Sequence, residues 1–233
     1  REDPAGTLAH IKELVHAALD KAGTALEDVV GIGVSVPSPV DVKQTGQLSP
    51  EVLPAWKDVN IVRAVEETFG LPTFVDNDAN LGALAELWWG AGQGGDDLAF
   101  VKIGTGVGCG LIVNGDVYRG VAGFAGELGH MSIVDASGSR EVDPRGRLTA
   151  LVGAEQIVSE ARRRLPEYPD STLASDEAIL SVRSIGQAAA EGDELATQIM
   201  TEAGHYLGVA IANLLNILNP KTVVLGGAIA SAG

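Results

Sequence analysis

The spacing of apolar residues predicts alternating helices and strands along the first part of the chain. Residues 3–23 and 61–70 carry apolar positions at helical spacing, and each run ends in a glycine. Between them, residues 29–36 form an apolar run typical of a buried strand, which Pro37 ends because proline cannot donate to a β-ladder. Helices that alternate with strands are typical of an α/β fold.

The segment from Pro39 to Trp56 shows neither helical nor strand periodicity. A connection of roughly 20 residues without structure of its own is more often functional than passive. We therefore expect either a flap over a ligand or a solvated loop.

The pattern changes from that of a strand to that of a helix around residue 76. A short apolar run ends at Val75, and Asp76, Asn77 and Asp78 follow it, three residues of types that favour helix starts. A carboxylate at a strand-to-helix switch of an α/β fold points into the crevice where ligands bind. Asp78 is therefore a candidate to hydrogen-bond a substrate hydroxyl. The alternative is that these three residues only cap a helix.

A glycine-rich segment, residues 104–110, follows a predicted strand at residues 98–103. Backbone N–H groups of such a loop can approach an anion, although a tight turn between two strands is the alternative. The phosphate-binding candidates are Gly104, Thr105 and Gly106. Beyond them, Asn114-Gly115 between two apolar runs predicts a β-hairpin.

Glu127 and His130 lie among the glycines of residues 120–130 and combine an acceptor with a switchable donor. A histidine in a loop is often structural, but the carboxylate three residues earlier favours a ligand contact here. Residues 137–147 are polar and predict a surface loop.

The last part of the chain is predicted to be largely helical. Helices are expected over residues 154–164, within 175–191 and over 193–218, the last of them largely buried. A strand at residues 222–225 then leads into a second glycine turn, formed by Gly226 and Gly227. That turn either receives a nucleotide or starts a further helix.

Composition restricts the partners of the chain. Its net charge of −15 and pI near 4.5 disfavour direct binding to a phosphate backbone. The single cysteine indicates a reducing compartment, so we expect a cytoplasmic protein. Apolar runs are shorter than a membrane span, and no signal-like leader opens the chain.

Four motifs of the chain resemble, in the same order, those of the ROK family of repressors, open reading frames and sugar kinases. They are residues 75–80, 103–108, 126–130 and 224–227. The resemblance implies an actin-like (ribonuclease H-like) α/β fold of two lobes that binds a sugar and ATP. Residues 1–76 would form the smaller lobe, and residues 77–233 the larger one.

The resemblance also implies roles for individual residues. Asp78 corresponds to the general base that deprotonates a sugar hydroxyl, and Asn77, Glu127 and His130 correspond to sugar contacts. ATP and Mg²⁺ would be the cofactors of a kinase. The residues that correspond to nucleotide contacts are Gly104, Thr105, Gly106, Gly226 and Gly227.

Two departures from the family pattern affect these expectations. The family's first phosphate loop, Asp-x-Gly-Gly-Thr, is absent, so we expect a core truncated at both ends. Arg140, Val142 and Arg147 stand where relatives have zinc-binding cysteines, and Thr149 replaces a sugar-binding glutamate. We therefore expect no structural zinc.

Residues 53–56, 76–86 and 118–120 resemble the actinobacterial repressor branch of the family. The expected function is a sugar-responsive transcriptional regulator, a homodimer that contacts DNA only through a segment outside this chain. The alternative is an ATP-dependent hexose kinase with Asp78 as its base. A third possibility is a scaffold that binds neither sugar nor nucleotide.

Overall fold

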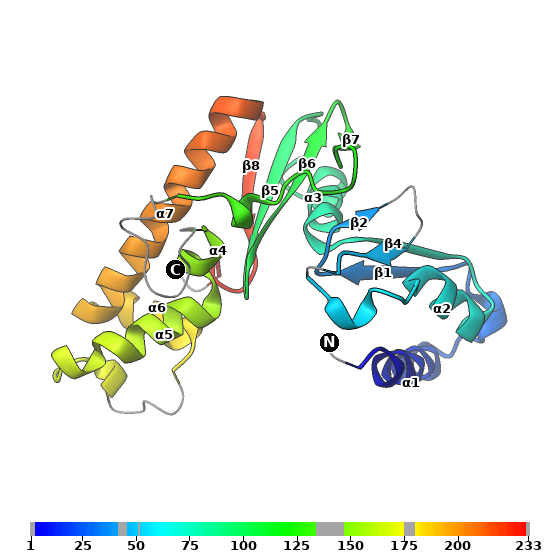
Figure 1. The fold of residues 1–233 in the computed structure, drawn as a ribbon, viewed down its shortest axis with the longest axis horizontal. Helices are drawn as coiled ribbons and strands as arrows, with labels where there is room; N and C mark the ends of the chain where they lie inside the picture. The colour runs from blue at the N-terminus through cyan, green and yellow to red at the C-terminus, as the bar shows by residue number, and fades with distance from the viewer. Residues whose placement is uncertain (1–2, 42–45, 51, 134–146, 175–179, 232–233) are drawn as a thin grey trace. The chain divides into compact units, whose positions relative to one another are not determined.

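The computed structural model describes residues 3–41, 46–50, 52–133, 147–174 and 180–231, and these fold into two compact units (Figure 1). Unit 1 comprises residues 1–81 and 119–125, and unit 2 comprises residues 82–118 and 126–233. The chain thus passes between the units three times. The expected lobe boundary after residue 76 remains a prediction, whereas the units divide after residue 81 and again around residues 119–125.

Unit 1 is built on a two-stranded parallel sheet with helices whose ends carry clear capping signals. Its strands are β1 (Ile32–Val36) and β4 (Thr73–Asn77). Helix α1 (Pro4–Ala22) begins where Asp3 Oδ1 accepts from Gly6 N at 3.0 Å, and helix α2 (Ile61–Phe69) begins at the Asn60 cap. Both helices end at a glycine with positive φ, as predicted. The 3₁₀ turn η1 (Leu26–Asp28) precedes β1, which begins three residues later than expected because its pairing with β4 starts only at Ile32. The prediction of a buried strand is wrong for most of β1, since Val36 is the one buried residue of its five.

The segment between β1 and α2 contributes to the core of unit 1, so the expectation of a solvated loop is wrong for its described residues. The expectation of a flap over a ligand stays a prediction. The segment holds β2 (Val40–Asp41), β3 (Gln47–Leu48) and the 3₁₀ turn η2 (Pro54–Trp56). Strands β2 and β3 pair antiparallel. Four apolar side chains of the segment are buried, which periodicity could not show because they lie at irregular spacing. They are Val40, Leu48, Leu53 and Trp56.

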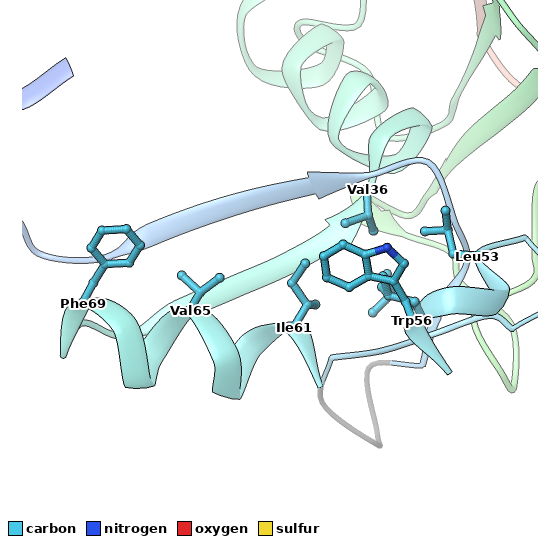
Figure 2. Packing of buried hydrophobic residues seen from close by; sticks show 8 residues of the cluster. Val36, Leu53, Trp56, Ile61, Val65 and Phe69 are labelled. Carbon is cyan, nitrogen blue, oxygen red and sulfur yellow. The ribbon is translucent and has the colours of Figure 1, made fainter. Parts of the chain in front are cut away.

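Figure 2 shows how these side chains complete the core beneath the sheet. Ile61, Val65 and Phe69 project from α2 toward the strands, at the i, i+4, i+8 spacing of one helix face. Trp56, at 4% exposure, fills the space between Ile61 and Val36.

Unit 2 contains a four-stranded mixed sheet in the order β7-β6-β5-β8. Its strands are β5 (Leu98–Ile103), β6 (Val107–Val113), β7 (Asp116–Val117) and β8 (Thr222–Gly226). The predicted hairpin is confirmed between β6 and β7, where Asn114 and Gly115 both have positive φ. The predicted loop at residues 104–110 is wrong beyond residue 106, because the remaining glycines lie inside β6, which pairs with β5.

The helices of unit 2 pack mainly against one another. They are α4 (Thr149–Val152), α5 (Ala154–Arg164), α6 (Val182–Ala190) and α7 (Glu194–Leu218), with 3₁₀ turns η3 (Leu128–His130) and η4 (Leu165–Glu167). Only six residues of α7 are buried, and Ile217 is 76% exposed near its end, so the prediction of a largely buried helix is wrong. No helix in the described part of the chain has the length and apolarity to span a membrane.

Helix α3 (Asp78–Trp89) starts in unit 1 and continues in unit 2, where it covers one face of the sheet. Gly82 on α3 lies against the ring of Phe100 in β5, and a Cβ there would stand 2.3 Å from a ring carbon. Glycine is therefore required at this position for the helix to lie close to the strand.

We predict that Trp56→Ala lowers the free energy of unfolding by about 3–5 kcal/mol, because it leaves a cavity in the core of unit 1. Val52→Ala is the matched control in the same segment. Val52 is 39% exposed, so its truncation should change stability by no more than about 0.5 kcal/mol. Urea unfolding measures both, and equal midpoints for the two variants would contradict the assignment of this segment to the core.

Candidate functional site

Asp78 stands at the first position of α3, as the sequence predicts, and Asn77 caps the helix. The Asn77 Oδ1 accepts from the backbone N–H groups of Ala79, at 2.8 Å, and Asn80, at 3.3 Å. This geometry satisfies two of the N–H groups that a helix start leaves without a partner. The Asp78 carboxylate, which is partly exposed, therefore lies in the first turn, where the helix dipole favours negative charge.

The amide nitrogen of Asn77 holds the turn that follows β1. Asn77 Nδ2 donates to the carbonyl of Ser38 at 3.2 Å. The Ser38 hydroxyl, which is 1% exposed, accepts from Ser49 N at 3.1 Å. Asn77 thus caps the helix, which is the alternative that the sequence offered. The Asn77 amide carries a second Nδ2 hydrogen in addition to the one donated to Ser38.

Asp76, which sequence reasoning assigned only to capping, is the buried acceptor of this region. The residue is 8% exposed in a unit where most carboxylates lie at the surface. Oδ1 accepts from Asn77 N at 2.8 Å and from Asn80 Nδ2 at 3.0 Å. Oδ2 accepts from Arg119 Nε at 3.2 Å and from Arg119 Nη2. Arg119 belongs to unit 1 although it is distant in sequence, so no local pattern could have identified this pair.

Glu127 and His130 lie together in unit 2, as their spacing suggested. The His130 Nε2 and the Glu127 Oε2 are 3.5 Å apart across the 3₁₀ turn η3. The histidine side chain is 55% exposed and the glutamate 29% exposed, so both groups can reach a ligand from solvent. Their pairing supplies one acceptor and one donor within a single turn.

Gly126 fixes the position of this turn on the sheet. Its φ is +86°, and its carbonyl accepts from Cys109 N at 2.9 Å. A Cβ at Gly126 would stand 1.8 Å from the carbonyl oxygen of Cys109. Cys109 itself is 3% exposed, and burial raises the pKa of its thiol to about 12.

The glycine turn between β5 and β6 packs against the start of α5. Gly104 N donates to Gly106 O, and Gly104 O accepts from Ala154 N, both at 2.9 Å. Thr105 is exposed at the tip, and a Cβ built on Gly104 meets nothing within 4 Å. The turn therefore has open space beside it, which a phosphate group could occupy.

Thr149, which replaces the expected sugar-binding glutamate, contacts the start of β6. Its Oγ1 accepts from Val107 N at 3.2 Å and would stand 2.3 Å from a Cβ at Gly129. The hydroxyl of Thr149 therefore has a structural partner.

Strand β8 ends at Gly226, beside the end of β5, and Gly227 follows it. Gly227 has φ +98°, and a Cβ there would stand 2.3 Å from the carbonyl oxygen of Ile103. The same carbonyl accepts from Ile229 N at 3.2 Å. The close approach of the two backbones explains the glycine at residue 227. Because β5 and β8 pair in parallel, this turn and the turn at residues 104–106 follow neighbouring strand ends.

The predicted site residues thus form two groups. Asn77 and Asp78 belong to unit 1, and the glutamate, the histidine and both glycine turns belong to unit 2. Within the described residues, no cluster of three or more potential metal ligands occurs. Arg147 forms a backbone bridge with Ser132, while Arg140 and Val142 lie outside the described residues. A guanidinium in place of a thiolate does not suit a zinc site.

We predict that Gly126→Ala lowers the free energy of unfolding by at least about 2 kcal/mol, because alanine disfavours this φ and would displace the Cys109 carbonyl. Gly208→Ala in the interior of α7 is the control. Nothing lies within 4 Å of a Cβ there, so alanine should stabilise the helix by about 1 kcal/mol. Thermal unfolding distinguishes them, and a Gly126→Ala protein as stable as the parent would refute the proposed close contact.

Comparison with known proteins gives relatives of two kinds. A glucokinase from Halalkalibacterium halodurans is 37% identical over 210 residues, which cover 88% of this chain and 63% of that protein. A xylose repressor from Caldicellulosiruptor bescii is 31% identical over 229 residues, which cover 97% of this chain and 57% of the repressor. The chain therefore spans less than two thirds of the length of either relative.

The fold agrees with solved structures. The crystal structure of a ROK family glucokinase from Streptomyces griseus in complex with glucose and AMPPNP matches with a TM-score of 0.85 and 28% identity, over 100% of this chain and 75% of that one. The predicted actin-like sugar kinase fold is confirmed. A family model described as the ROK family matches residues 1–233, and the chain therefore belongs to the ROK family.

Proposed function

We propose that this chain is the sugar-binding core of a sugar-responsive transcriptional regulator. The observation that carries sugar binding is the placement of Asn77 and Asp78 at the capped start of α3, within a chain that matches the ROK family from end to end. In this proposal Asn77, Asp78, Glu127 and His130 contact the sugar hydroxyls. Sugar hydroxyls both donate and accept, so carboxylates, an amide and an imidazole suit them.

One observation favours a regulator over an enzyme. Thr149 stands where the family pattern has a further sugar-binding carboxylate, and its hydroxyl already accepts from Val107 N. A regulator needs to bind its sugar but does not need to orient it for phosphoryl transfer. DNA would be contacted by a segment outside this chain, in a cytoplasmic homodimer.

An ATP-dependent hexose kinase is the second candidate, and the intact Asp78 at the helix start favours it. The 37% identity to a glucokinase supports the same reading. Gly104, Thr105 and Gly106 would hold the phosphates, and Gly226 and Gly227 would lie near the adenosine. ATP with Mg²⁺ supplies the phosphoryl group. The contribution of Asp78 would be to accept the proton of the sugar hydroxyl.

We predict that the full-length protein binds one of glucose, xylose and N-acetylglucosamine, and that this sugar weakens its binding to operator DNA. Calorimetry measures the first effect and a gel mobility shift the second. Asp78→Asn should raise the sugar Kd by roughly tenfold, because the carboxylate accepts more strongly than an amide. Asp58→Asn, an exposed carboxylate in the same unit, is the control.

The kinase reading predicts a different result with ATP and Mg²⁺. Phosphorylation of a hexose that Asp78→Asn abolishes would establish the enzyme and reject the regulator as the sole function. Turnover that survives Asp78→Asn would remove Asp78 as the base. Sugar binding without turnover supports the regulator, and a protein that binds no sugar is the scaffold that both candidates exclude.

We also predict that the purified protein carries no stoichiometric zinc and that EDTA leaves its melting temperature unchanged. His130 is the one residue remaining from the family's zinc ligands, and one imidazole does not form a structural site. Elemental analysis and thermal unfolding with and without chelator measure both. One zinc per chain, lost together with stability in His130→Ala, would show that this prediction is wrong.

A further inference from the structure

In unit 1, an ion pair joins Asp76, which directly precedes the candidate sugar residues Asn77 and Asp78, to Arg119, which is distant in sequence. Arg119 Nε and Nη2 both donate to Asp76 Oδ2, and Nε does so at 3.2 Å. The pair is largely shielded from water, because the side chains are 29% and 10% exposed respectively. A shielded fork of this kind is more rigid than a surface ion pair, which solvent screens.

The other carboxylate oxygen of Asp76 holds the start of α3. Oδ1 accepts from the backbone of Asn77 and the side chain of Asn80. Asn77 and Asn80 lie on either side of Asp78 in the chain, so the carboxylate that binds Arg119 also bonds the backbone N–H that precedes Asp78 and the side chain of the residue two positions after it. Asp76 thus joins the start of α3 to Arg119.

Arg119 is itself held in a closed loop. Its carbonyl accepts from Ala125 N at 3.2 Å, and Gly120 and Gly123 have positive φ, which allows the chain to turn back within residues 119–125. Gly126 follows at once and is fixed on β6 by Cys109. The segment that ends in Glu127 is thus anchored at its beginning by Asp76.

We propose that Asp76 and Arg119 are positioning residues for the sugar site: their ion pair sets the orientation of Asn77 and Asp78 and ties it to the segment that leads into Glu127. This inference rests on the proposed sugar-binding function and adds to it two residues that do not themselves touch the sugar. A purely structural pair would stabilise unit 1 without affecting ligand affinity.

The test compares stability and sugar affinity in variants of the full-length protein. Arg119→Met removes the charge and the fork, and Arg119→Lys keeps the charge but loses the fork. Arg119→Met leaves a buried carboxylate without its cationic partner and is expected to lower stability, so Asp76→Asn/Arg119→Met is included to remove that charge as well. Arg63→Met is the control, since it breaks an exposed ion pair with Glu67 in the same unit.

The probes are glucose, xylose and N-acetylglucosamine in calorimetry, with melting temperature measured in parallel. We expect the double variant to melt above Arg119→Met yet to bind sugar at least about tenfold more weakly than the parent. Arg119→Lys should lie between the parent and Arg119→Met in affinity, and Arg63→Met should match the parent.

Parental affinity in the double variant or in Arg119→Met overturns the inference, because the pair would then serve stability alone. A double variant that melts no higher than Arg119→Met also overturns it, because the two residues would not act as a pair. A parent protein that binds none of the three sugars instead rejects the proposed function, and the inference with it. The parent's own binding therefore distinguishes the two failures.

Discussion

Burying a carboxylate costs free energy unless several donors surround it, and this constraint governs the junction between β4 and α3. Asp76 meets the requirement with a backbone N–H, an amide and a guanidinium, drawn from residues 77, 80 and 119. These donors can converge only when the strand has ended, the helix has begun and the chain has returned from unit 2. The Asp76 side chain therefore joins the start of α3 to the segment at residues 119–125.

The elements whose ends carry local signals could be predicted from the sequence. Helix α2 matches its expected bounds because Asn60, Gly70 and the apolar spacing between them act within a few residues of one another. Strand β5 and helix α5 match for the same reason. The start of α3 at Asp78 followed from residue types alone, since Asn and Asp favour this position wherever they can satisfy free N–H groups.

Features that depend on distant contacts were missed. Trp56 is buried by residues of α2 and β1, and nothing in its immediate neighbours indicates that. Helix α7 has apolar residues at helical spacing along its whole length, but only part of it meets other helices, so periodicity overstated its burial. In the candidate site, motifs identified the candidate residues, and residue type suggested that Asn77 caps a helix. They could not show that Thr149 bonds Val107 or that Arg119 pairs with Asp76.

The buried thiol of Cys109 has a practical consequence for measuring distances between the two units. Thiol reagents react with the thiolate, and a pKa of about 12 leaves almost none of it at neutral pH. Cys109 is also the only cysteine in the sequence. A cysteine introduced at an exposed position in each unit can therefore be labelled with a fluorophore pair while the native residue stays in place. Distances between the units can then be followed in solution as sugar or nucleotide is added.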